Sequence, residues 1–238
     1  MEKSDTEIDD PIGVIVTASH ILGDEGLGDM LWGHVSIRDP EGRGLWMKAH
    51  LFGFEEIERE NVLLISFDGE ILEGSGRRHG EYPIHTEIMR ARPDVNCVVH
   101  THPFHAVAFA ATQQPLLPMS HDATPFTPPD IPRFTRTGEL ITTAELGADL
   151  ARTLGDRPAL LIPHHGVAVA GPTVSAAVMS TILLEHACAS QLAARDIKTW
   201  SSDEEALSKR SVCWSPTQFD IGWDYFVRKS ERLRRSGR

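Results

Sequence analysis

Two histidines that follow an apolar run constrain this chain most strongly. The run ends as Val98-Val99-His100-Thr101-His102-Pro103. If it forms a strand, its side chains alternate between two faces, so that His100 and His102 point to the same side, about 6–7 Å apart. Two imidazoles so placed can bind one metal ion. We therefore expect the fold to bring further ligands to the end of this strand.

Two other segments supply candidates for those ligands. Glu81 precedes the His-x-His motif, and Pro163-His164-His165-Gly166 follows it. Three histidines and one carboxylate can form a divalent-metal site that leaves room for a substrate to displace water. The sequence thus predicts a metal centre of His100, His102, Glu81 and one histidine of the later pair.

Composition and charge exclude several classes of protein. The 238 residues carry a net charge of −11, which argues against a nucleic-acid partner. The basic residues gather near the C-terminus, from Arg228 to Arg238, as the solvated end of a final helix. No stretch has the ~20 apolar residues of a membrane span, and Met1–Asp5 do not begin a secretory signal. Three widely spaced cysteines indicate reduced thiols and a cytoplasmic protein.

Hydrophobic periodicity and turn residues predict the order of the elements. We expect helices over 11–30, 82–92, 104–112, 143–154, 174–194 and 219–235, and strands over 32–38, 45–48, 62–67, 70–72, 96–101, 160–162 and 167–171. Residues 115–138 contain six prolines and predict a long loop. Because strands and helices do not alternate strictly, we expect an α/β fold with a mostly antiparallel sheet and helices on both faces.

The motifs of the metal site resemble the class II aldolase/adducin family. The resemblance runs from Gly33-His34-Val35-Ser36-Ile37-Arg38, through Glu81 and 92–102, to His165-Gly166-Val167 and the helix near 174–194. It implies a single three-layer αβα domain over 1–238 and a cyclic homotetramer with active sites between neighbouring subunits. It also implies that His100, His102 and His165 bind a divalent metal. Glu81 is then a ligand or an acid/base.

Departures from the family pattern argue against a sugar-phosphate substrate. Aldolase members hold phosphate with an Asn, a Thr-Gly pair and two serines. Here those positions read His34, Leu51-Phe52-Gly53, and His79 and Gly80. A tyrosine that such members donate from the adjacent subunit aligns with His121. A phosphosugar aldolase is therefore disfavoured.

Basic side chains replace the phosphate-binding residues. Arg77, Arg78 and His79 stand close to Glu81, and Lys48, His50 and His34 accompany them. Guanidinium and imidazole groups suit carboxylates, which Arg binds with two hydrogen bonds. The pattern resembles the decarboxylase branch of the family, which acts on dihydroxyphthalates and hydroxypyridine-dicarboxylates.

This resemblance implies a metal-dependent decarboxylation of a small carboxylate substrate. Glu81 is the first candidate for the acid that protonates the ring carbon, and His121 of a neighbouring subunit is the second. Arg77, Arg78, His79, His34 and Lys48 are the candidate substrate-binding residues. Mn²⁺ or Zn²⁺ is the expected metal, with Fe²⁺ as an alternative.

Several alternatives remain open at the level of sequence. An aldolase that acts on an unphosphorylated substrate would use the same metal site. An adducin-like interaction module would keep the fold but would not be catalytic. Either the loop 115–138 or the segment 213–238 can reach a neighbouring site. His85 either supports the structure or contributes to function. We expect Trp32 and the other tryptophans to be packing residues rather than platforms on which a ligand stacks.

Overall fold

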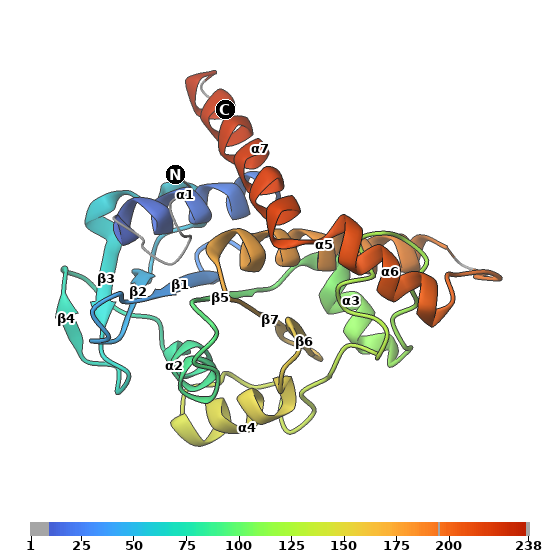
Figure 1. Ribbon diagram of the computed structural model, residues 1–238. Coiled ribbons are helices and arrows are strands. Elements are labelled where there is room, and N and C mark those ends of the chain that lie inside the picture. Colours follow the sequence, from blue (N-terminus) through green and yellow to red (C-terminus); the bar gives the residue numbers. More distant parts are fainter. Residues whose placement is uncertain (1–9, 195, 237–238) are drawn as a thin grey trace.

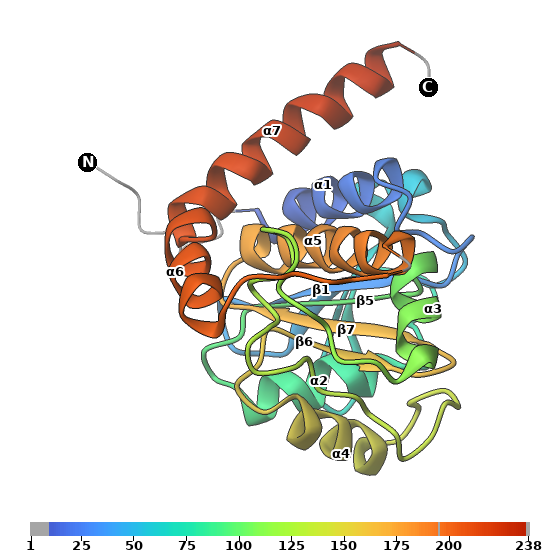
Figure 2. The same ribbon diagram turned by 90° about the vertical axis from the view of Figure 1, so that its right-hand side faces the viewer.

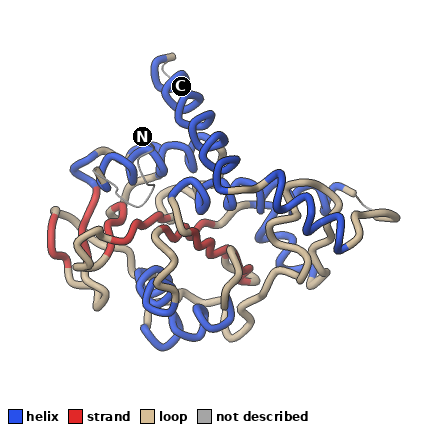
Figure 3. Tube along the Cα trace, viewed as in Figure 1, coloured by secondary structure: helices blue, strands red, loops and turns tan. Residues whose placement is uncertain are grey.

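A single antiparallel sheet forms the centre of the molecule. The computed structural model describes residues 10–194 and 196–236. Within them, seven strands follow the order β4-β3-β2-β1-β5-β7-β6, each antiparallel to its neighbours, and Figure 3 shows them surrounded by helices. The strands are β1 (His34–Arg38), β2 (Leu45–Lys48), β3 (Val62–Ile65), β4 (Ile71–Glu73), β5 (Cys97–Thr101), β6 (Ala159–Ile162) and β7 (Gly166–Gly171).

Helices cover both faces of this sheet (Figure 1). Those of the described residues are α1 (Pro11–Asp24), α2 (Tyr82–Ala91), α3 (Phe104–Thr112), α4 (Ala144–Leu154), α5 (Val174–Ala193), α6 (Asp203–Cys213) and α7 (Pro216–Arg235). Two short 3₁₀ turns, η1 (Phe54–Glu56) and η2 (Arg59–Asn61), precede β3.

Each face of the sheet has its own apolar core, because successive side chains of a strand point to opposite sides. One core joins α1, α3 and α5 to side chains such as Val35 and Val99. The other joins α2 and α4 to side chains such as Leu63 and Val98. Figure 2 shows α1 and α5 on one side of the sheet and α2 and α4 on the other. The predicted three-layer αβα sandwich with an antiparallel sheet is confirmed.

Two helices differ from the sequence prediction. The first ends at Asp24 rather than at residue 30, since Gly26 adopts a left-handed φ of +70° that a helix cannot continue through. Helix α6 was not predicted, although Ser202 and Glu205 form a reciprocal capping box at its start. Its mean hydropathy is low and its one buried residue is Ala206, so hydrophobic periodicity could not reveal it.

The two ends of the chain are described only in part. Helix α7 begins at Pro216, slightly before the predicted 219, and its C-terminal half projects from the body (Figure 2). The expectations for Met1–Asp5 and for Arg238 fall outside the described residues. Among the helices that are described, none combines the length and apolar character needed to cross a membrane.

The loop 115–138 lies against the body and has no regular structure. Phe126 and Phe134 are buried in its course. Arg157 donates hydrogen bonds to the carbonyls of Phe126 and Pro129, and Arg210 of α6 donates to those of Thr124 and Pro128. The bonds of Arg210 attach the loop to α6, and those of Arg157 attach it to the turn between α4 and β6.

Three strand ends meet at one edge of the sheet. Thr101 at the end of β5 pairs with Val167 near the start of β7, and His34 at the start of β1 pairs with His100. Antiparallel pairing therefore brings segments that are far apart in the sequence to the same place. The N-terminus of α2, which carries Glu81 as its N-cap, lies on the face to which His100 points.

Candidate metal centre and cleft

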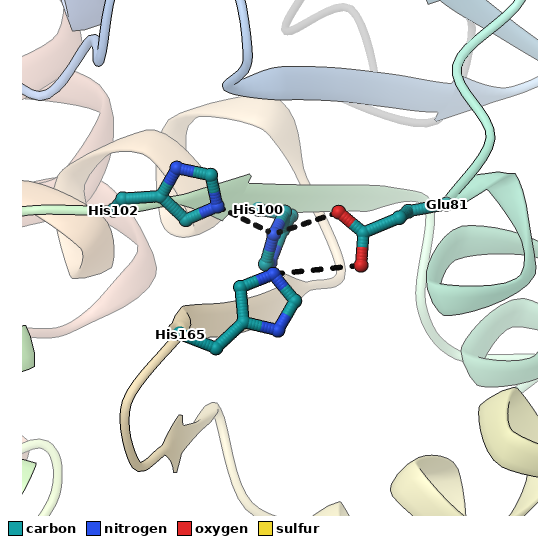
Figure 4. A group of neighbouring side chains, drawn as sticks. All are labelled: Glu81, His100, His102 and His165. Atoms are coloured by element: carbon teal, nitrogen blue, oxygen red, sulfur yellow. Dashed lines mark hydrogen bonds and ion pairs between the residues drawn. The ribbon is translucent and has the colours of Figure 1, made fainter. Parts of the chain in front are cut away.

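Glu81, His100, His102 and His165 gather at this edge (Figure 4). One potential ligand atom from each residue lies within 4.8 Å of all the others. The Nε2 atoms of His100 and His102 are 3.1 Å apart. The Glu81 carboxylate lies 3.7 Å from His100 Nε2 and 3.4 Å from His165 Nε2. This set of three nitrogens and one carboxylate suits Zn²⁺, Mn²⁺ or Fe²⁺.

The outer nitrogens of two histidines are already engaged. His100 Nδ1 donates a hydrogen bond of 2.9 Å to the Val167 carbonyl, which leaves Nε2 with its lone pair. His102 Nδ1 lies 3.3 Å from the Asp29 carboxylate, so its Nε2 also faces the group. Such outer partners orient metal-binding histidines. Asp29 was not a candidate, because nothing in the sequence around it marks it.

His165, and not its neighbour His164, belongs to the group. Both ring nitrogens of His165 are buried and make no hydrogen bond, which is costly unless something binds them. His164 has a left-handed φ of +66° and an exposed side chain. His165 Nε2, which is buried without a hydrogen bond and lies 3.4 Å from the Glu81 carboxylate, is the atom that fits a metal ligand.

Charge in the group also suits a cation. Burial raises the pKa of the Glu81 carboxyl, but the neighbouring His165 and His100 rings and the Ile141 N–H outweigh burial and lower it to about 2. The Ile141 N–H donates a 2.7 Å bond to this carboxylate. Burial lowers the pKa values of His100 and His102. The group thus combines one carboxylate with two imidazoles, those of His100 and His102, whose uncharged forms burial favours.

Gly166 allows the strands to approach each other at the metal group. A Cβ atom there would lie 2.5 Å from the Thr101 carbonyl oxygen and 2.6 Å from His102 Cδ2. Both separations are too short for real contacts, so only glycine lets β7 pass beside His102 without displacement.

The group opens into a cleft of about 1110 Å³. Of the predicted substrate-binding residues, His34, Arg77 and His79 line it. Trp32 and Phe104 line it too and are 45% and 78% exposed. The expectation that Trp32 is a packing residue is therefore wrong, because it lies at the cleft, just before the start of β1.

Arg78 and Lys48, two other candidates, are not among the residues that line the cleft. Arg78 stacks its guanidinium 4.1 Å from the centre of the Tyr82 ring and donates to the Gly69 carbonyl. Lys48 is fully buried and donates a 2.7 Å bond to the Phe52 carbonyl, with its Nζ 3.4 Å from His79 Nε2.

His121 lies beside α6 rather than in this cleft. Its Nδ1 is 3.6 Å from Cys213 Sγ, and its carbonyl accepts a hydrogen bond from the Trp214 indole. The other two cysteines, Cys97 and Cys188, are buried, and all three thiols are free.

Known proteins match this chain over most of its length. A family model described as the class II aldolase and adducin N-terminal domain matches residues 14–192. A 3,4-dihydroxyphthalate decarboxylase of Arthrobacter keyseri is 31% identical over 72% of this chain and 73% of its own. The meiotically up-regulated gene 14 protein of Schizosaccharomyces pombe is 30% identical over 75% of this chain and 70% of its own.

A solved structure has the same fold. The L-fuculose 1-phosphate aldolase from Glaciozyma antarctica superposes with a TM-score of 0.83, covering 95% of this chain and 90% of that one. Its sequence identity is 22%, so this likeness concerns the fold alone.

Proposed function

Because the chain belongs to the class II aldolase and adducin family, we propose that it is a divalent-metal-dependent decarboxylase of a hydroxylated aromatic or heteroaromatic carboxylate. Family membership and relatives named decarboxylases support a lyase. The observation that carries the proposal is the Glu81, His100, His102 and His165 group at the cleft, in which the buried His165 Nε2 makes no hydrogen bond.

Glu81, His100, His102 and His165 would hold the cation, which would supply positive charge to stabilise the negative charge left when CO₂ departs. Arg77 lines the cleft and can hold the carboxylate that remains on the ring. His34 and His79 offer hydrogen bonds from the same wall. Arg78 and Lys48 support this wall through their contacts with Tyr82 and His79.

The acidity of Glu81 supports a role as ligand rather than as acid. With its pKa lowered to about 2, the carboxyl has no proton to give near neutral pH. We therefore assign protonation of the ring carbon to a second group. His121 of a neighbouring subunit is our candidate, in a homotetramer whose loop 115–138 and helix α6 complete the adjoining site.

The cellular compartment, the metal and the alternative functions are inferred in the same way. Three free thiols suit a reducing cytoplasm. The donor set suits Zn²⁺ or Mn²⁺ first and Fe²⁺ second. An aldolase on an unphosphorylated substrate is the second candidate, because the same group can stabilise an enediolate. An adducin-like module without chemistry is disfavoured by the intact metal group.

Measurement of CO₂ release tests the proposal. Metal-reconstituted protein is incubated with hydroxylated phthalates and pyridine-dicarboxylates, with His102→Ala as the inactive control and bound metal measured in both proteins. We expect release from at least one compound by the wild type alone. Tight metal binding with no release from any compound would reject decarboxylation in favour of aldol cleavage.

A further inference from the structure

Three buried polar side chains form a hydrogen-bonded series beside the metal group. Ser36 Oγ lies 2.6 Å from His85 Nδ1, and His85 Nε2 lies 2.6 Å from His34 Nδ1. Ser36 and His85 are fully buried, and His34 is 2% exposed. The series runs from β1 to α2 and back to the start of β1, between the sheet and the helix that Glu81 caps.

His34 is the end of this series that faces a ligand. Its ring lines the cleft, 4.9 Å from the centre of the His100 ring. Its Nδ1 is occupied by His85. A molecule in the cleft can therefore meet His34 only through Nε2.

The order of the protons along the series follows from the serine. Among the hydrogen bonds of the described residues, the Ser36 hydroxyl has one partner, His85 Nδ1. If His85 donated to Ser36, the buried hydroxyl proton would have no acceptor, which is unfavourable. The two contacts fit the order in which Ser36 donates to His85 Nδ1, His85 Nε2–H donates to His34 Nδ1, and His34 carries its proton on Nε2.

His34 is also an uncharged donor. The groups around its ring are His79, His85, His100 and Lys48, which are all bases. Because its Nδ1 accepts the proton of His85 Nε2, His34 carries a proton on Nε2 alone and is therefore uncharged. A neutral N–H favours an oxygen that gains charge during a reaction over an anion that is charged from the start.

We propose that His34 donates its uncharged Nε2–H to a substrate oxygen that gains negative charge as CO₂ leaves, and that His85 and Ser36 are positioning residues that fix this tautomer. The inference rests on the proposed function and narrows it. The substrate carries a hydroxyl or carbonyl oxygen conjugated with the carbon that loses CO₂, and its permanent anion lies toward Arg77.

Nuclear magnetic resonance tests the tautomer without any substrate. Long-range ¹H–¹⁵N spectra of the zinc-loaded protein report which nitrogen of each of the 12 histidines carries a proton. His34 is assigned as the signal lost in His34→Asn. We expect protonated Nε2 and bare Nδ1, and a mixture of tautomers in Ser36→Ala. A bare Nε2 in the wild type, or an unchanged His34 signal in Ser36→Ala, would overturn the inference.

Kinetics test the contribution to the transition state. On the substrate found in the CO₂ assay, we expect His85→Phe to lower kcat about 10–100-fold with KM within about twofold, as for other outer partners of catalytic groups. His85→Gln can still donate to His34 and should recover part of the loss. Thr86→Val alters the next buried residue of α2, whose hydroxyl bonds only within the helix, and should leave kcat unchanged.

The two proposals fail in different ways. If wild-type protein releases no CO₂ from any compound, the decarboxylase proposal fails, and the spectra still decide the tautomer of His34. If CO₂ is released but His85→Phe raises only KM, or Thr86→Val is equally impaired, the role of the series is refuted and the decarboxylase stands.

Discussion

Glu81 is the one anionic member of the metal group, so its charge should dominate affinity for a cation. In Glu81→Gln the neutral amide keeps the shape but removes the charge. We expect metal affinity to fall at least about tenfold, with loss of CO₂ release as a consequence. Metal content after dialysis against a weak chelator measures this. A variant that keeps its metal and loses only turnover would instead identify Glu81 as the proton donor.

Lys48 should impose a pH dependence on stability. Burial lowers its pKa from 10.5 to about 7, so between these values the unfolded chain binds the proton and the folded chain does not. The free energy of unfolding should therefore rise with pH from about 7 to 10.5, on the order of 5 kcal/mol in total from this residue.

Chemical denaturation at several pH values checks this expectation. In Lys48→Met that part of the rise should be absent, whereas Lys198→Met, which alters an exposed lysine, should behave as the wild type. Parallel curves for the wild type and Lys48→Met would contradict the assignment.

The sequence predicted the residues of the metal group, but it did not predict the neighbouring residues that orient side chains at the site. His100 and His102 share a face by strand geometry, and order along the chain pointed to Glu81 and His165. Asp29, which orients His102, lies in a glycine-containing loop without periodicity. His85 could be placed on the same helix face as Glu81, but its contact with His34 depends on packing that spacing does not encode.

At the level of elements, the closeness of β5 and β7 should control the metal group. Gly166→Ala places a methyl group against the Thr101 carbonyl and the His102 ring. We expect a loss of about 1–3 kcal/mol in stability, typical of overpacking, and weaker metal binding. Thermal unfolding and metal titration measure both. Gly28→Ala, whose Cβ would meet Phe54 at an ordinary 3.4 Å, should change neither.

Elements with strong periodicity or clear turns were predicted within a few residues, and the others were not. Helix α2 and strand β5 have buried faces that the sequence displays. Helix α6 is defined by its cap and by contacts with the loop 115–138 rather than by an apolar stripe. The capping box of Ser202 and Glu205 could have indicated the start of this helix. Because the segment is polar and lacks an apolar stripe, hydrophobic periodicity did not support a helix there.

At the level of the whole molecule, His121 tests whether the active site is shared between subunits. His102→Ala and His121→Ala should each be inactive alone. If His121 serves a neighbour's site, co-expression of the two variants should restore about a quarter of wild-type activity, since a random ring assembles that share of intact sites. Activity of purified mixed oligomers measures this. No recovery in confirmed mixtures would show that His121 does not serve the site of a neighbouring subunit.

The metal-binding histidines and the residues of the cleft wall lie on different segments of the chain. His100, His102 and His165 stand at β5 and β7, whereas the cleft residues Arg77 and His79 stand on the loop between β4 and α2. A replacement of residues 74–80 alters what the cleft accepts without moving the three histidines, provided that Glu81, which directly follows the loop, keeps its place. Grafting these seven residues from a relative is therefore a route to a changed substrate on the same metal group.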